Sequence, residues 1–384
     1  MVTTQTADNV LKSYYLGAVA DQLNKSVNPF LAKIKQTASD VWGRDVRKAV
    51  RVGVNGGIGA GTETGALPTA SGNRYEQFVS ALKNLYGTIE ISDKAIRSSA
   101  SNEGAFVDLL NDEMQSLVES ASCNFGRMLF GDGSGAIAKV TGATGSVYTV
   151  DGTENLAEGM IVDMWSATAK VMDGRKITAI DRKNKKVTIA GSAVTVSASD
   201  SVSLYVHNSK DLEITGLKAI FDADTLYGIP RSGNEWLEPY KADSVGDLTE
   251  NVLQKAIDAV EERSGSKINF IVTSPGVRRA FFNTLSAYRQ IETMELEGGF
   301  RAISFNGIPI VTDRFCQKNT MYLLNTEDFG LHQLCDWQWL EGEDGKVLKQ
   351  LADKPVFRAT LVKYAELMCY RPAGQARLSG ITEA

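Results

Sequence analysis

Residues 51–73 read RVGVNGGIGAGTETGALPTASGN, and the glycines in this stretch decide between two folds. A β-branched run that enters a cluster of glycines is typical of a strand that delivers a dinucleotide's pyrophosphate to the N-terminus of a helix. No helix can follow Gly61 here, because Gly65, Pro68 and Gly72 interrupt the segment. The stretch therefore predicts a flexible loop tip and not a phosphate-binding loop.

The residues on both sides of this tip have the character of β-strands. The pattern is clearest after the glycines, where Leu85, Ile89 and Ile91 alternate with polar residues. Two extended arms, roughly 46–54 and 75–92, predict a long β-hairpin with a glycine-rich tip. The basic stretch at the start of the first arm is typical of a solvated strand face, and it comprises Arg44, Arg47, Lys48 and Arg51.

Residues 102–130 carry the strongest helical periodicity in the chain. Apolar side chains recur every three or four positions from Phe106 to Leu129, while acidic side chains fall on the other faces. A helix of about 29 residues is roughly 43 Å long at 1.5 Å per residue, which is enough to cross a whole domain. Gly131 and Gly133 end the pattern.

Beyond this helix the pattern changes twice. Six short strand-like runs over 136–210 predict a small β-barrel or sandwich, inserted between the helix and a later α/β region. Its basic turn, 182–186, is typical of a hydrophilic hairpin tip, with contact to an acidic partner as the alternative. The later region predicts a helix over 247–263, a buried strand over 268–274 and a helix that begins at Pro275.

The composition is that of a soluble protein with a mild negative charge. The chain has 384 residues, of which 43% are hydrophobic and 23% charged, and a net charge of -5. This length predicts two or three domains with large cores. The charge argues against a dedicated nucleic-acid binder. We find neither a signal peptide nor an apolar run near the roughly 18 residues of a membrane helix.

A dehydrogenase is the main enzymatic alternative. The stretch around Gly53 and Gly56 resembles the start of a glyceraldehyde-phosphate-type dehydrogenase, and SASCNF around Cys123 resembles its nucleophile segment. The required helix and the acidic ribose ligand about 20 residues later are both absent from the pattern. With two histidines, four scattered cysteines and no other catalytic motif, we expect no enzyme activity, no catalytic residue, no cofactor and no metal site.

The order of the elements carries a resemblance to a known family. An N-terminal arm, a glycine-tipped hairpin, a long helix, an α/β domain and a returning tail resemble, in that order, a tailed-bacteriophage major capsid protein of the HK97 type. Three local stretches resemble the same family, namely residues 216–240, 307–325 and the ending RPAGQARLSGI. The resemblance covers nearly the whole chain, and its specificity rests on the order of the motifs.

The resemblance implies an α+β, HK97-like capsid fold with an inserted small all-β domain. The hairpin would be the E-loop, which lies across a neighbouring subunit, and the long helix would be the spine of the P-domain. The implied division is as follows: 1–45 N-terminal arm, 46–92 E-loop hairpin, 93–135 P-domain spine helix, 136–210 inserted β-barrel or sandwich, 211–244 P-domain linker segment, 245–352 A-domain and 353–384 C-terminal strands of the P- and A-domains.

The resemblance also implies a function in assembly. Copies of the chain would form hexamers and pentamers of an icosahedral virion shell that encloses double-stranded DNA without sequence-specific binding. Assembly would take place in the host bacterial cytoplasm, with a scaffolding protein, a portal and decoration proteins as further partners and no membrane. An encapsulin-like protein compartment, which shares the fold and encloses enzymes, is the alternative.

Two departures from the family pattern matter. Residues 55–74 contain no lysine, and Lys48 and Lys83 lie well down the arms, so we expect no crosslink between subunits through the loop tip. The short segment before the hairpin favours a separate scaffolding protein, or none, unless the sequence is already the processed form. We expect valine at the three tip glycines to impair assembly. The candidate assembly residues are Gly57, Gly59, Gly61, Glu63, Pro68, Arg44, Arg47 and Lys48.

Overall fold

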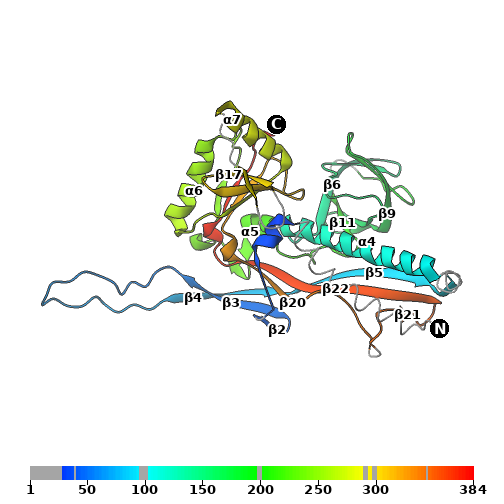
Figure 1. Cartoon of the computed structure of the whole chain (residues 1–384), viewed down its shortest axis with the longest axis horizontal. Coiled ribbons are helices and arrows are strands. Elements are labelled where there is room, and N and C mark those ends of the chain that lie inside the picture. Colours follow the sequence, from blue (N-terminus) through cyan, green and yellow to red (C-terminus); the bar gives the residue numbers. More distant parts are fainter. Residues whose placement is uncertain are drawn as a thin grey trace.

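The computed structural model describes residues 28–38, 40–94, 103–196, 201–288, 293–295, 301–342 and 345–384. These residues form a long sheet with a helix along it, a hairpin that projects from one end, a barrel, and a mixed sheet with two helices (Figure 1). Most of the N-terminal arm expected over 1–45 lies outside the described residues. In the part of the chain that is described, no helix is long and apolar enough to cross a membrane.

The long sheet is built around β22 (Val356–Cys369). One edge of β22 pairs antiparallel with β5 (Lys83–Ser92), and its other edge pairs with β20 (Phe329–Trp339) and the short β21 (Lys349–Gln350). A further strand, β1 (Lys35–Thr37), lies parallel to β20. Segments from the first quarter of the chain and from near its end therefore meet in one sheet (Figure 1).

The helix α4 (Glu103–Phe130) lies along this sheet and is the spine of the molecule. Its inward side chains, which include Met114, Phe125 and Leu129, are buried in the largest hydrophobic core. The predicted helix over 102–130 is confirmed over its described residues, which are those of α4. Gly87 of β5 lets the helix approach closely, because a Cβ atom there would lie 3.1 Å from the Leu117 side chain.

Short elements fill the space around the spine. The helix α2 (Pro29–Lys33) packs Phe30 edge-on against Phe329 at 5.3 Å between ring centroids. The helix α5 (Leu217–Asp222) lies near the end of α4. The remaining short elements are the pair β12 (Thr225–Leu226) and β13 (Ile229–Pro230) and the single 3₁₀ turns Glu235–Leu237, Thr326–Asp328 and Pro372–Gly374.

The projecting hairpin is shorter than the sequence predicted. The strands β3 (Asp45–Val52) and β4 (Arg74–Ala81) pair antiparallel along their whole length, and β2 (Val41–Trp42) extends their sheet. Beyond Leu82, whose N–H donates to the Arg44 carbonyl at 3.0 Å, the chain leaves the hairpin and β5 pairs with β22. The predicted arm 75–92 is therefore two strands, β4 and β5. Alternation of apolar and polar residues identifies a strand but not the strand with which it pairs.

Residues 136–206 form a closed six-stranded barrel where the sequence predicted a small barrel or sandwich. Its core is separate from the main core and includes the fully buried Val162, Met164 and Leu204. In chain order the strands are β6 (Ala136–Thr144), β7 (Val147–Val150), β8 (Ile161–Trp165), β9 (Lys170–Asp181), β10 (Lys186–Ile189) and β11 (Val202–Val206).

A seven-stranded mixed sheet forms the last part, with one face under α6 (Glu250–Ser264) and α7 (Pro275–Tyr288) and the other on the main core. Thr249 caps the start of α6 by accepting a hydrogen bond from the Val252 N–H, and Gly265 ends it at a φ of 64°. Across the sheet the strands are β14 (Tyr240–Ala242), β23 (Ala376–Leu378), β19 (Met321–Leu324), β15 (Phe270–Thr273), β18 (Ile308–Thr312), β17 (Arg301–Phe305) and β16 (Thr293–Glu295).

The predicted α/β domain over 245–352 needs correction at both ends. The strands β20 and β21 fall inside that range but belong to the long sheet. The strands β14 and β23 lie outside it and belong to the mixed sheet, where they pair with one another in parallel. The chain crosses between the two sheets twice after β19, and a single sequence carries no local signal for such crossings.

Candidate assembly surfaces

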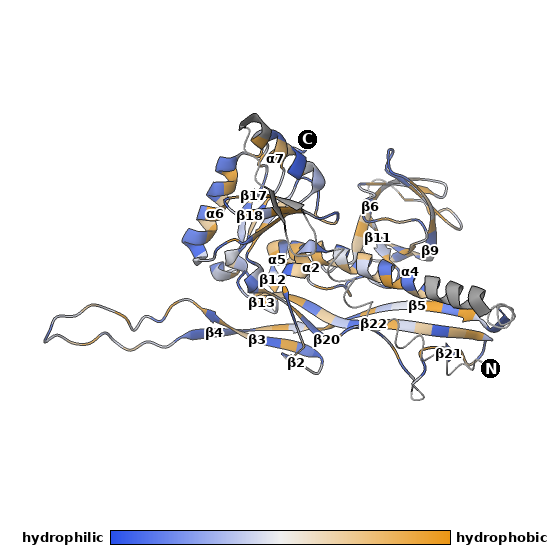
Figure 2. Cartoon of the chain, in the orientation of Figure 1, coloured by the Kyte–Doolittle hydropathy of each residue, from blue (hydrophilic) through white to orange (hydrophobic). Residues whose placement is uncertain are grey.

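The tip of the hairpin exposes apolar side chains that are left almost uncovered by the described part of the chain. Val54, Ile58 and Leu67 are 89%, 83% and 90% exposed, and the whole loop projects away from the rest of the molecule (Figure 2). Burial of an aliphatic side chain of this size contributes about 1.5–3 kcal/mol. An exposed apolar surface of this kind is typical of a site of contact with another molecule.

The tip glycines are held close to the opposite side of the loop. The Gly57 N–H donates to the Asn55 side chain at 2.9 Å. A Cβ atom at Gly57 would lie 3.1 Å from the Ser71 nitrogen, and one at Gly59 would lie 3.3 Å from Pro68. Gly61 has more room, because its nearest neighbour would be 3.7 Å away. Close approach of the two sides of the loop, and not a left-handed backbone, is what favours glycine at Gly57 and Gly59.

The basic residues at the base of the hairpin form a second group, separate from the tip. The side chains of Arg44 and Arg47 are exposed beside Asp45, at 3.5 and 3.9 Å. Lys48 instead contacts Asp40 at 3.0 Å, and its hydrogen bond lowers the pKa of that carboxyl group. The predicted assembly residues therefore lie at two places, with Glu63 exposed in the tip and Lys48 engaged within its own chain.

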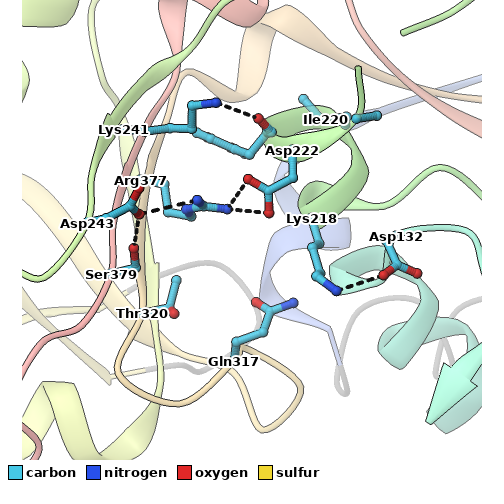
Figure 3. A network of polar contacts seen from close by, with 12 residues as sticks. Asp132, Lys218, Ile220, Asp222, Lys241, Asp243, Gln317, Thr320, Arg377 and Ser379 are labelled. Atoms are coloured by element: carbon cyan, nitrogen blue, oxygen red, sulfur yellow. Dashed lines mark hydrogen bonds and ion pairs between the residues drawn. The ribbon is translucent and has the colours of Figure 1, made fainter. Parts of the chain in front are cut away.

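Arg377 joins the mixed sheet to the spine side of the molecule. Its guanidinium group donates to both carboxylate oxygens of Asp222 in α5, each at 2.7 Å, and also contacts Asp243 at 3.4 Å (Figure 3). The Ser379 hydroxyl donates to Asp243, which orders that carboxylate in turn. Both bonds to Asp222 come from Nη1, which bridges the two carboxylate oxygens in a charge-assisted pair. The network sets the angle between the mixed sheet and α5.

Ion pairs also brace the barrel against the rest of the chain. Arg127 of α4 pairs with Glu213 just after the barrel, and both side chains are buried. Glu154 of the barrel pairs with Lys318 from the turn before β19. A cleft of about 410 Å³ lies between these parts, and its walls include Arg127, Glu154 and Lys318. Sequence reasoning missed these residues, because their partners lie far away along the chain.

Two buried carboxyl groups have pKa values above the usual range for carboxyl groups. Burial raises the pKa of Glu366 in β22 to about 7, against the hydrogen bond that it accepts from the Thr215 N–H at 3.0 Å. Burial likewise raises the pKa of Asp313 to about 6, and that residue accepts from the Phe315 N–H at 2.9 Å. Glu366 also interacts with the side chains of Thr215 and Ser80, and Asp313 lies near the buried Cys316 thiol, whose pKa it helps to raise.

Asp163, Asp173 and His207 come close together on the barrel, but Asp163 is already saturated with partners. One of its oxygens contacts His207 Nδ1 at 2.7 Å and accepts from the Gly174 N–H at 2.7 Å. The other accepts from the Asn208 N–H at 2.9 Å and pairs with Lys170 at 3.0 Å. These partners account for the cluster as a hydrogen-bond hub that ties three barrel segments together.

The comparisons with known proteins identify the fold and no sequence relative. No model of a protein family matches the sequence, and no curated protein does. The capsid of cyanophage A-1(L) is 12% identical with a TM-score of 0.54, over 94% of this chain and 93% of that chain. The SrpI encapsulin from Synechococcus elongatus PCC 7942 is 11% identical with a TM-score of 0.51, over 93% and 89%. This chain therefore has the fold of these two shell proteins.

Proposed function

We propose that this chain, whose fold is that of the HK97-type capsid proteins, is the major capsid protein of a tailed bacteriophage. The observation that carries the proposal is the projecting loop with its exposed Val54, Ile58 and Leu67. An isolated chain gains nothing from such a loop, whereas a neighbouring copy that covers it stabilises the assembly. Closed symmetry repeats that contact and multiplies its effect.

In this proposal the parts of the chain have distinct tasks. The hairpin is the E-loop, the long sheet with α4 is the P-domain, and the mixed sheet is the A-domain at the centre of each hexamer or pentamer. The barrel is an insertion that decorates the shell or braces neighbours. The shell encloses double-stranded DNA in the virion and is assembled in the host cytoplasm, with scaffolding, portal and decoration proteins as its partners. The lysine-free tip forms no covalent crosslink.

A cellular compartment shell is the second candidate, because the encapsulin has nearly the same TM-score. The three local stretches that resemble phage capsid proteins favour the first candidate. The dehydrogenase alternative has no support in the fold. The strand β3 is followed by a loop, and no helix begins between residues 53 and 73 to bind a pyrophosphate.

Electron microscopy of the purified chain, alone and co-expressed with a scaffolding protein, tests the proposal. We expect uniform closed shells that package double-stranded DNA when the packaging machinery is present. Shells that instead enclose a specific protein, with no DNA, would favour the compartment. A chain that stays monomeric under all these conditions would contradict both candidates.

A further inference from the structure

We propose that the basic turn of the barrel in one copy docks on the acidic face of α6 in the next copy. With Asp181 included, the basic turn comprises residues 181–186, from the last residue of β9 to the first of β10. The acidic face comprises the exposed carboxylates of residues 247–263. The inference rests on the proposed function, because it requires several copies to assemble. It adds a contact that the projecting hairpin does not make.

The basic turn carries a net positive charge and is held in place by hydrogen bonds. Residues 181–186 hold four basic side chains and one acidic side chain, a net charge of +3. Arg182 donates to the Thr153 carbonyl at 2.8 Å, which ties the turn to the barrel, and Asn184 donates to Asp181 at 2.7 Å within the turn. Lys183, Lys185 and Lys186 are exposed, and none of them has an ion pair among the described residues.

The acidic face of α6 carries a net negative charge equal in magnitude to the positive charge of the basic turn. Residues 247–263 carry five acidic and two basic side chains, a net charge of -3. The apolar side of the helix, with Leu253, Ala256 and Val260, is buried against the mixed sheet. The carboxylates therefore face away from the sheet, and within the described part of the chain none forms an ion pair. They are Asp247, Glu250, Asp258, Glu261 and Glu262.

The two surfaces cannot meet within one chain. In Figure 1 the helix α6 lies on the side of the mixed sheet that faces away from the barrel. The projecting hairpin extends toward the same end of the molecule as α6. A neighbour that covers the hairpin therefore lies at the end of the molecule that carries α6. Contacts between unlike surfaces are head-to-tail, and when the rotation between copies closes they generate a ring.

Charge complementarity of this kind acts mainly on the rate and register of assembly. Exposed ion pairs contribute little each, and salt screens them. Opposite patches nevertheless steer two copies into one orientation and suppress others. The contact should therefore speed assembly at low salt and matter less at high salt.

Charge reversal of each surface, alone and together, tests the inference. The first variant carries Lys183→Glu, Lys185→Glu and Lys186→Glu, and the second carries Asp258→Lys, Glu261→Lys and Glu262→Lys. The matched control carries Lys94→Glu, Lys349→Glu and Lys354→Glu, which are exposed lysines outside both surfaces. Light scattering follows the assembly rate at low and high salt, electron microscopy counts closed shells, and thermal melting checks that each chain is folded.

We expect each reversed surface to slow assembly at low salt by about tenfold and to flatten its salt dependence. The combined variant should recover most of the wild-type rate, while the control assembles normally. Two reversed surfaces that assemble at the wild-type rate, or a combination that is no better than either, would overturn the inference and leave the shell intact. A basic-turn variant that loses only DNA would overturn it in favour of nucleic acid. Failure of the wild-type chain to assemble would instead refute the proposed function.

Discussion

At the scale of residues, burial lets the carboxyl group of Glu366 keep its proton up to nearly neutral pH. Its pKa rises from an ordinary value of 4.5 to about 7 because the side chain is buried in the long sheet. Between these two pH values the folded chain retains a proton that the unfolded chain releases. The free energy of unfolding therefore falls as the pH rises through this window, by on the order of 3 kcal/mol.

Glu366→Gln should remove this pH dependence, because glutamine keeps an acceptor for the Thr215 N–H and carries no charge. We expect the variant to gain stability relative to wild type at pH 8 and to show little difference at pH 5. Urea unfolding of both chains at the two pH values measures this. If the free energy of unfolding changed by the same amount in both chains between pH 5 and pH 8, Glu366 would not titrate as stated.

Arg377→Met should loosen the mixed sheet from α5. Methionine keeps contact with Phe221, over whose ring the guanidinium lies at 5.8 Å, but loses both bonds to Asp222. We expect a loss of about 1–3 kcal/mol in the free energy of unfolding. Arg74→Met, which removes an exposed pair with Glu76, is the control and should cost less than about 1 kcal/mol. Equal losses in the two variants would mean that the Arg377 network contributes no more than a surface pair.

At the scale of elements, the sequence predicts where the helix and the strands form, but it does not predict which strands pair with one another. The predicted helix 102–130 is confirmed over its described residues, because its periodicity lies within the segment and Gly131 follows it directly. The strand pattern of β5 was also found, but its assignment to the hairpin was wrong. Its true partner, β22, lies more than 260 residues later, and nothing in either segment alone names the other.

Gly216→Ala should separate α5 from the end of α4. A Cβ atom at this position would lie 2.3 Å from the Met128 carbonyl oxygen and 2.6 Å from that of Gly131, and neither backbone group has a flexible end to move. We expect a loss of about 2–4 kcal/mol in thermal or urea unfolding. Gly142→Ala is the matched control, because a methyl group added there would have nothing within 4 Å. A fully stable Gly216→Ala chain would contradict the close packing described.

At the scale of the whole molecule, the sequence predicts only part of the candidate assembly surfaces, namely the position of the hairpin tip. The glycines located the hairpin tip, because their effect on the backbone is local. The apolar character of the tip became meaningful only when the structure left Val54, Ile58 and Leu67 without partners. The Arg377 and Lys318 contacts had no local signal, since each joins segments brought together by the fold.

Val54→Ser, Ile58→Ser and Leu67→Ser together should impair assembly and leave the single chain stable. These side chains bury nothing in one copy, so we expect a change of less than about 0.5 kcal/mol in the free energy of unfolding. Assembly should be lost or should need a much higher protein concentration, as measured by sedimentation and electron microscopy. Thr62→Ala and Thr69→Ala, also exposed in the tip, form the control. Normal shells from the triple serine variant would rule out the tip as an apolar contact.

The barrel has a further consequence for how this molecule could diversify. Its first and last strands, β6 and β11, are neighbours, with Ala136 opposite Tyr205, so the chain enters and leaves the barrel at one place. The barrel also has a closed sheet and a core of its own. A module of this kind can be exchanged, enlarged or deleted with little disturbance to its host. Residues 136–206 are therefore a natural position at which a foreign domain could replace the barrel in every copy of the chain.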